Sequence, residues 1–204
     1  MTGTLSPASA THRARLTAGL AAAIADKGYA AATIADVVAN AHVSKRTFYE
    51  HFADKEACFL ALYAETSDAL LEVIADAVAR TGGGWDARLA TAARAYFERV
   101  AAEPALIRTG MIEIQAAGPA ARRLRREVQR RYADMLRTLS EEAAAEEPGI
   151  APLSPVLATA VVGGIDELML EAVEENADMG TLAGAAIELI RAVLARPDAV
   201  PAAR

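Results

Sequence analysis

A pair of short amphipathic segments within residues 33–52, separated by a tight turn, constrains the fold more than any other feature. The first segment opens on Thr33 in the sequence TIAD, where the hydroxyl group and Asp36 three positions later form the capping-box pattern. After a polar turn, Ser44 can cap a second short helix that runs to about Tyr49. Two such helices with apolar residues on their inner sides predict a helix-turn-helix.

Helical periodicity also extends along the rest of the chain, and no segment shows a convincing alternation of apolar and polar residues. Glycine and proline divide the chain: Gly28 is placed to end the first helix, and three glycines at 82–84 end the fourth. These signals predict helices over roughly 16–27, 33–39, 44–49, 54–81, 86–103, 105–117, 120–146, 155–175 and 181–196. We therefore expect an all-α protein.

Composition narrows the class of protein further. The chain has 204 residues, 53% of them hydrophobic, which is enough to bury a sizeable core. Cys58 is the only cysteine, so neither an intramolecular disulfide nor a cysteine-built metal site is possible. The charge-free segment 148–165 contains three prolines and three glycines, so it predicts a loop and a buried helix, not a membrane span. With no secretory signal pattern at its start, the chain is expected in the cytoplasm.

The net charge of −6 hides an asymmetry along the chain. Residues 1–63 hold six Lys/Arg against five Asp/Glu, whereas residues 64–204 hold fifteen against twenty-two. A locally basic N-terminal part on an acidic body is compatible with nucleic-acid binding by that part alone.

The predicted helix-turn-helix presents the side chains that a DNA groove requires. If Val43 and Phe48 face inward, Lys45, Arg46 and Thr47 project outward. Long cationic donors suit phosphates and guanine edges, and a short hydroxyl suits a close helix approach. Three further residues at the helix exit and the next helix start supply donors for phosphate oxygens: Tyr49, His51 and Lys55.

In these motifs the chain resembles the TetR family of bacterial transcriptional regulators. The resemblance is carried by G-Y-x-x-x-T-I-A-D-V-V (28–38), V-S-K-R-T-F-Y-E-H-F (43–52) and D-K-E-A (54–57). It implies an N-terminal three-helix DNA-binding domain, 1–58, joined by a long fourth helix to a larger helical effector-binding and dimerisation domain, 59–204. It also implies that the following residues match DNA-contacting positions: Thr33, Ser44, Lys45, Arg46, Thr47, Tyr49, His51 and Lys55.

One residue departs from the family pattern, which usually has glycine in the turn as A-G-V-S. Here the turn reads Ala41-His42-Val43-Ser44. If position 42 requires a positive φ, histidine tolerates it better than most non-glycine residues, at some cost in strain. We expect the turn to form.

The larger domain is expected to pair with a second copy through its last two helices. Apolar faces with small residues allow close helix approach, and a twofold dimer doubles the base pairs that one helix-turn-helix can read. The candidate interface residues are Val161, Gly164, Ile165, Leu168, Met169, Leu182, Ala186, Ile190 and Val193. Candidates for an effector pocket between the middle helices are Trp85, Tyr96, Phe97, Met111, Ile112, Glu113 and Gln115.

The function favoured by these residues is a ligand-responsive transcriptional regulator. We expect a repressor that binds a palindromic double-stranded DNA operator as a homodimer and is released by a small-molecule effector. The alternative is an all-α enzyme or small-molecule-binding protein with a merely structural helix-turn-helix. No catalytic set, phosphate loop or metal-ligand spacing supports that alternative, so we expect neither catalysis nor a cofactor. An Arg-rich run at 122–131 is interpreted as a solvated or salt-bridged face. An acidic run at 166–175 could mimic a carboxylate metal site, but no histidine follows His51 to complete one, so no metal is expected there.

Overall fold

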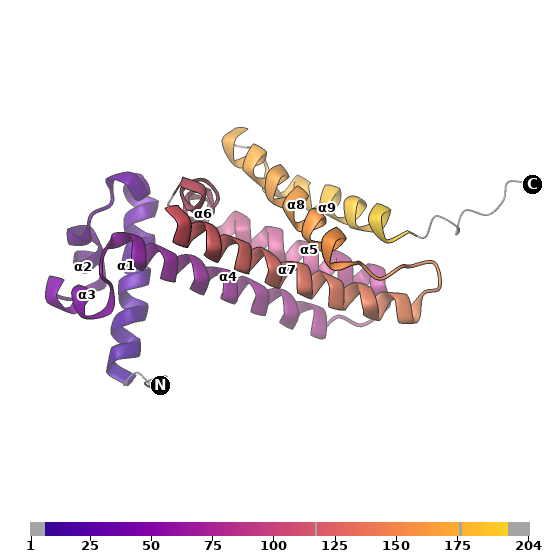
Figure 1. The fold of residues 1–204 in the computed structure, drawn as a ribbon, viewed down its shortest axis with the longest axis horizontal. Coiled ribbons are helices and arrows are strands. Elements are labelled where there is room, and N and C mark those ends of the chain that lie inside the picture. The colour runs from indigo at the N-terminus through magenta and orange to yellow at the C-terminus, as the bar shows by residue number, and fades with distance from the viewer. Residues whose placement is uncertain (1–6, 117, 176, 196–204) are drawn as a thin grey trace, which may run out of the picture. The chain divides into compact units, whose positions relative to one another are not determined.

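A computed structural model describes residues 7–116, 118–175 and 177–195 (Figure 1). Every regular element in these ranges is a helix, apart from a single bridge between Ile150 and Ala195. The helices in chain order are α1 (Pro7–Ala31), α2 (Ile34–Ala41), α3 (Lys45–His51), α4 (Lys55–Ala79), α5 (Trp85–Ala102), α6 (Pro104–Ala116), α7 (Gly118–Glu146), α8 (Pro155–Glu175) and α9 (Met179–Leu194). The predicted all-α class is confirmed.

Local signals in the sequence account for most helix ends. From α4 onward, each predicted boundary lies within two residues of the observed one, and α8 has the predicted ends. The first helix differs, since α1 continues to Ala31 across a kink at Gly28, where φ is 79° and ψ is 162°. Only glycine readily adopts this backbone conformation, so Gly28 breaks the straight run of α1 as predicted but does not end the helix.

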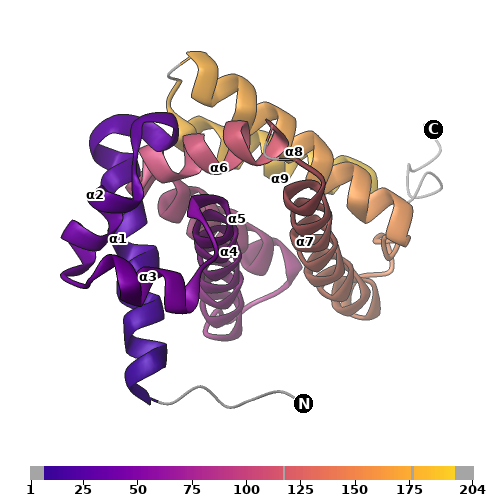
Figure 2. The same cartoon turned by 60° about the vertical axis from the view of Figure 1, so that its left-hand side comes forward.

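The chain divides into two compact units. The first comprises Pro104–Leu124 and the described part of Met1–Asp68. In it, α1, α2 and α3 pack together (Figure 2), and their core includes the fully buried side chains of Leu16, Val37 and Phe48. Helix α6 packs against α1 and adds the buried Ile114 to the same core.

Close backbone approach between α1 and α2 depends on one glycine. A Cβ atom at Gly19 would lie 2.6 Å from the carbonyl oxygen of Val37, a distance that real Cβ atoms do not reach. The Asn40 amide on α2 also donates to the Gly19 carbonyl at 3.1 Å. This crossing fixes α2 on α1, and thereby the base on which α3 is presented.

The second unit comprises Ala69–Glu103 and the described part of Arg125–Arg204. Helix α9 packs against both α5 and α8, and α8 and α9 lie side by side in both cartoon views (Figures 1 and 2). Its core contains Trp85, Leu89, Leu136 and Leu194, all buried. Helices α4 and α7 each run from one unit into the other, and the domain boundary predicted at residue 58 stays a prediction.

Candidate nucleic-acid interface and ligand cavity

Helix α2 begins with the predicted capping box. The Asp36 amide donates to Thr33 Oγ1 at 3.3 Å, and the Thr33 amide and hydroxyl donate to Asp36 Oδ2 at 2.9 and 2.7 Å. Lys27 adds an ion pair to the same carboxylate at 3.0 Å. The hydrogen bonds from Thr33, and then that from Lys27, lower the pKa of Asp36 to about 2. Thr33 is exposed, but its hydroxyl already serves the start of α2.

The turn between α2 and α3 contains the predicted strained residue. His42 has φ 51° and ψ 48°, the left-handed conformation, and it ends α2 with its amide directed at Ala39 and Val38. Its carbonyl accepts a hydrogen bond from the Arg15 guanidinium on α1 at 2.9 Å. The expected positive φ is therefore present, and the imidazole is exposed.

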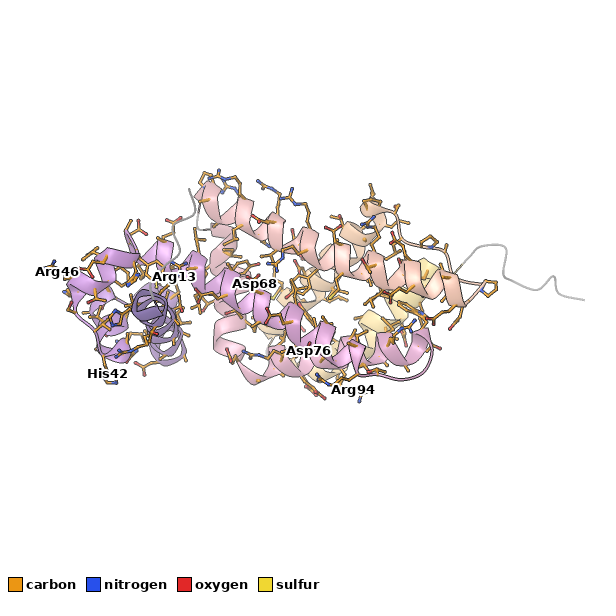
Figure 3. The ribbon with its side chains drawn as sticks, turned by 90° about the horizontal axis from the view of Figure 1, so that it is seen from below. Arg13, His42, Arg46, Asp68, Asp76 and Arg94 are labelled. Atoms are coloured by element: carbon orange, nitrogen blue, oxygen red, sulfur yellow. The ribbon has the colours of Figure 1, made fainter. Side chains whose placement is uncertain are left out.

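Helix α3 is held by its first residue and by one buried aromatic. Ser44 Oγ accepts the Thr47 amide at 3.0 Å, and the Ser44 and Thr47 hydroxyls lie 3.0 Å apart. Phe48 is completely buried in the core of the unit. Because these contacts fix the inner side of α3, Lys45 and Arg46 on the other side are exposed, and Arg46 and His42 project outward in Figure 3.

The guanidinium of Arg46 on α3 is almost fully exposed to solvent. Its side chain is 89% exposed, and it forms an ion pair with Glu50 one turn later, at 3.1 Å. An exposed pair at this spacing contributes about 0.3–0.5 kcal/mol. The pair is thus a weak competitor for a phosphate or a guanine edge.

The three residues predicted to donate to phosphates at the end of α3 and the start of α4 differ in their surroundings. Tyr49 is 58% exposed, and its ring meets Phe48 edge-on. His51 is half-buried, with its ring 6.2 Å from that of His12. The Lys55 ammonium, in contrast, is directed into the protein, toward backbone carbonyls.

Lys55 fastens α4 to the end of α1. Its Nζ donates to the carbonyls of Tyr29 and Ala32 at 2.8 and 2.9 Å and lies 4.3 Å from the centre of the Tyr29 ring. Burial, and then the charge of Glu56, raise the pKa of Tyr29 to about 12. The structure therefore gives Lys55 a role in the fold, and its predicted phosphate contact stays a prediction.

A cavity of about 100 Å³ lies inside the second unit, between residues of α4, α5, α7, α8 and α9. Its wall is almost entirely apolar, and it includes Phe97, Leu136 and Ile165. A second cavity of about 490 Å³ shares the wall residues Ile74, Met135 and Leu139 with the first. Concave apolar spaces of this kind between helices are common small-molecule sites.

The predicted pocket residues do not all lie at this cavity. Tyr96 and Phe97 line it, whereas Trp85 is buried in the core cluster of the same unit. The remaining predicted residues are on α6, which belongs to the first unit: Met111, Ile112, Glu113 and Gln115. The Gln115 side chain lies outside the described part of the structure. A ligand role for the α6 residues stays a prediction.

Asp166 lines the cavity but is absent from the predicted pocket residues, because the acidic run was considered only as a metal site. Its carboxylate accepts from Gln129 Nε2 at 2.7 Å and pairs with Arg125 Nη2 at 3.3 Å. Burial raises the pKa of Asp166 above its usual range, although Gln129 and Arg125 favour the charged form. The signal was present in the spacing, since Asp166 lies four residues after Val162 and three before Met169, both buried.

Four of the nine predicted dimer-interface residues are buried within the single chain: Val161, Met169, Ala186 and Ile190. The other five are half-buried: Gly164, Ile165, Leu168, Leu182 and Val193. Instead, the most exposed large apolar side chains of α8 are Val156 and Leu157, at 77% and 46% exposure. Whether a second copy covers the predicted residues stays a prediction.

Other chemistry is sparse among the described residues. They include no group of three or more His, Cys, Asp or Glu side chains arranged to hold a metal ion. Cys58 is fully buried in the core of the first unit, and burial raises the pKa of its thiol to about 12. No helix in the described ranges is long and apolar enough to cross a membrane.

Residues 16–62 match the family model of bacterial regulatory proteins, tetR family. This range covers α2, α3 and the buried hydrophobic residues of α1 from Leu16 onward. It therefore contains the two capped helices and the strained turn at His42. The resemblance found in the sequence motifs is thereby confirmed. No curated protein matches the chain in overall sequence.

Solved structures share the fold over nearly the whole chain. The fatty acid degradation regulator FadR from Bacillus halodurans is 20% identical, with a TM-score of 0.78 over 95% of this chain and 100% of that one. FadR from Bacillus subtilis, in complex with stearoyl-CoA, is 20% identical, with a TM-score of 0.74 over 87% and 96%. A tetR-family regulatory protein from Rhodococcus RHA1 is 22% identical, with a TM-score of 0.67 over 91% and 98%. At these identities the likeness establishes the fold.

Proposed function

We propose that this chain, whose residues 16–62 match the model of the tetR-family bacterial regulatory proteins, is a ligand-responsive repressor that binds a palindromic operator as a homodimer. The observation that carries the proposal is the outer side of α3. Lys45 and Arg46 are exposed there, while Ser44 and Phe48 hold the helix in place from the inner side. A rigid helix with free cationic donors meets the requirements of the major groove.

Binding to DNA would use the exposed donors in two ways. Arg46 can exchange its weak contact with Glu50 for a guanine edge or a phosphate. Tyr49 and Lys45 are exposed beside it and can donate to phosphates, which position the helix without reading sequence.

Dimerisation follows from the small number of base pairs that one helix can read. Two recognition helices about 34 Å apart would enter successive major grooves on one face of the DNA. The exposed side of α8 supports pairing with a second copy, because Val156 and Leu157 stand beside the small residues Ala160 and Gly163, which allow close helix packing.

Release would depend on the ligand cavity in the second unit. A ligand larger than about 100 Å³ would fit the apolar cavity best if the helices around it shift. Such a ligand binds one arrangement of the body more tightly than the other, and it can shift the equilibrium only by that difference in affinity. The stearoyl-CoA complex of Bacillus subtilis FadR supports a ligand-binding body in this fold.

The proposed regulator acts in the cytoplasm and catalyses no reaction. Its partners are operator DNA, a second copy of itself and a small-molecule effector. The competing function, an enzyme or carrier with a structural helix-turn-helix, predicts no sequence-specific DNA binding.

Fluorescence anisotropy of the purified protein with the DNA upstream of its own gene tests this proposal. We expect binding that resists an unrelated competitor duplex and weakens steeply between two salt concentrations, as phosphate contacts require. Selection from a random DNA pool identifies the operator if it lies elsewhere, and it should return an inverted repeat. A selection that enriches no sequence would refute the proposal.

A further inference from the structure

We infer that Asp166 anchors the effector, and that the effector is a mainly hydrocarbon molecule whose polar head donates a hydrogen bond, as an alcohol or amine does. This inference rests on the proposed ligand-binding function of the same cavity. It excludes a carboxylate or phosphate head at this point of the wall.

The first step is the unequal use of the two carboxylate oxygens. The Gln129 amide and the Arg125 guanidinium both approach Oδ2, at 2.7 and 3.3 Å. Neither contact involves Oδ1, and no described residue donates to it. The Asp166 side chain is 21% exposed, and Oδ1 is not a fully enclosed atom. Asp166 therefore keeps an accessible acceptor that the fold leaves unused.

The second step is the environment of that acceptor. Asp166 lines the apolar cavity together with Leu136, Val162 and Ile165. Burial raises the pKa of its carboxyl, while the Gln129 hydrogen bond and the Arg125 charge act in the opposite direction. A charged oxygen that lacks a donor in such surroundings gains more from a ligand hydrogen bond than one in water. A donating head should thus bind on the order of 10- to 100-fold more tightly than the same hydrocarbon without it.

The third step is the sign of the head group. A carboxylate or phosphate near Oδ1 would face the like charge of Asp166, which lines the cavity. Arg125 is already paired with Asp166, so it does not present a spare positive charge to the cavity. An alcohol or an ammonium group avoids this repulsion, and an ammonium adds attraction.

The volume limits the size of a first probe. An apolar cavity of about 150 Å³ can hold benzene, so the space of about 100 Å³ suits one small ring after slight adjustment. A matched series on one ring isolates the head group: cyclohexane, cyclohexanol, cyclohexylamine and cyclohexanecarboxylate.

The chain provides its own reporter. Trp85 is the only tryptophan, and it lies in the core cluster that includes the cavity residues Leu136, Val162 and Ile190. Titration of the full chain with each probe, followed by Trp85 fluorescence and checked by calorimetry, gives four dissociation constants. We expect the alcohol and the amine to bind at least about 10-fold more tightly than cyclohexane, and the carboxylate to bind most weakly.

Two substitutions of Asp166 separate its charge from its hydrogen bond. Asp166→Leu should remove the preference for the alcohol over cyclohexane. Asp166→Asn keeps an acceptor, so it should retain the alcohol preference but lose the preference for amine over carboxylate. Glu167→Gln, an exposed neighbour, is the matched control and should leave all four constants unchanged. Thermal unfolding of each variant confirms that it folds.

The outcomes are distinct. Equal affinity for cyclohexane and cyclohexanol in the unmodified chain, or an alcohol preference that survives Asp166→Leu, would overturn the role of Asp166 and leave the cavity as a ligand site. If none of the four probes binds, both the role of Asp166 and the effector site proposed above are refuted, while operator binding remains an independent measurement.

Discussion

The guanidinium of Arg15 on α1 donates to the backbone carbonyl of His42 at 2.9 Å. Among the residues that the structure describes, His42 is the one non-glycine residue with a positive φ. The contact joins the first helix to the turn that orients α3. A long cationic side chain thus supports a backbone conformation that histidine adopts less readily than glycine, and the turn forms with the residue that departs from the family pattern.

Replacement of the strained residue should stabilise the protein. His42→Gly removes the Cβ strain of the left-handed conformation, partly offset by the greater freedom of glycine in the unfolded chain, so we expect a gain of up to about 1 kcal/mol. Ala39→Gly, on the exposed side of α2, is the control and should cost about 1 kcal/mol. Urea unfolding measures both. A loss of stability in His42→Gly would show that the imidazole contributes more than the strain costs.

The removal of one cationic side chain should weaken DNA binding without unfolding the protein. Arg46→Ala loses a side chain that is 89% exposed, so the melting temperature should hardly change. Operator affinity should fall by about 10-fold or more. Arg80→Ala is the matched control, because Arg80 is an exposed arginine with its own acidic partner one turn away, Asp76. Equal affinity in both variants would remove Arg46 from the interface.

The capping box at the start of α2 should make stability depend on acid pH. The folded pKa of Asp36 is about 2, below the ordinary value of 3.8, so its ionised form stabilises the folded state above about pH 4. That stabilisation is lost as the pH falls through the folded pKa. Asp36→Asn should therefore lower stability at neutral pH, and the difference from the unmodified chain should shrink between pH 4 and 2.

The control for this measurement is Asp26→Asn, an exposed aspartate on α1. Any loss of stability that Asp36→Asn shows beyond that of Asp26→Asn is then specific to the cap. A pH-independent effect of Asp36→Asn would mean that the charge of Asp36 does not support the cap.

The kink of α1 should tolerate no side chain at Gly28. A Cβ there would meet no atom within 4 Å, yet φ is 79° and ψ is 162°, so Gly28→Ala should cost about 1–3 kcal/mol from backbone strain alone. Gly82→Ala also adds a Cβ to open space, but without a positive φ, and it should be neutral or slightly stabilising. Chemical unfolding of the two variants compares them directly, and similar stabilities would contradict the strained conformation.

Cys58 should resist alkylation in the folded protein. With a thiol pKa of about 12, roughly 1 thiol in 10,000 is ionised at pH 8, and the side chain is fully buried. Because it is the only cysteine, incorporation of iodoacetamide followed by mass spectrometry reports it alone. Labelling should be complete in guanidinium chloride and very slow in buffer. Rapid labelling in buffer would show that the core around α4 opens readily.

Local sequence signals determined the helices and the frame of the DNA-binding site. The capping box at Thr33, the cap at Ser44 and the proline and glycine breaks act over three or four residues, so they can be read without knowledge of distant contacts. The outward position of Lys45 and Arg46 follows from the same short-range periodicity, once Phe48 is assigned to the inner side.

Contacts between segments far apart in sequence decided what the motifs alone left open. Lys55 matches a DNA-contacting position, but it binds carbonyl groups at Tyr29 and Ala32, which only the packing of α4 against α1 brings near it. Asp166 lies in an acidic run, but Arg125 and Gln129, about 40 residues earlier, make it part of a cavity wall. Burial and hydrogen bonding depend on which helix faces which, and local periodicity fixes a residue's side of its own helix without identifying the neighbour.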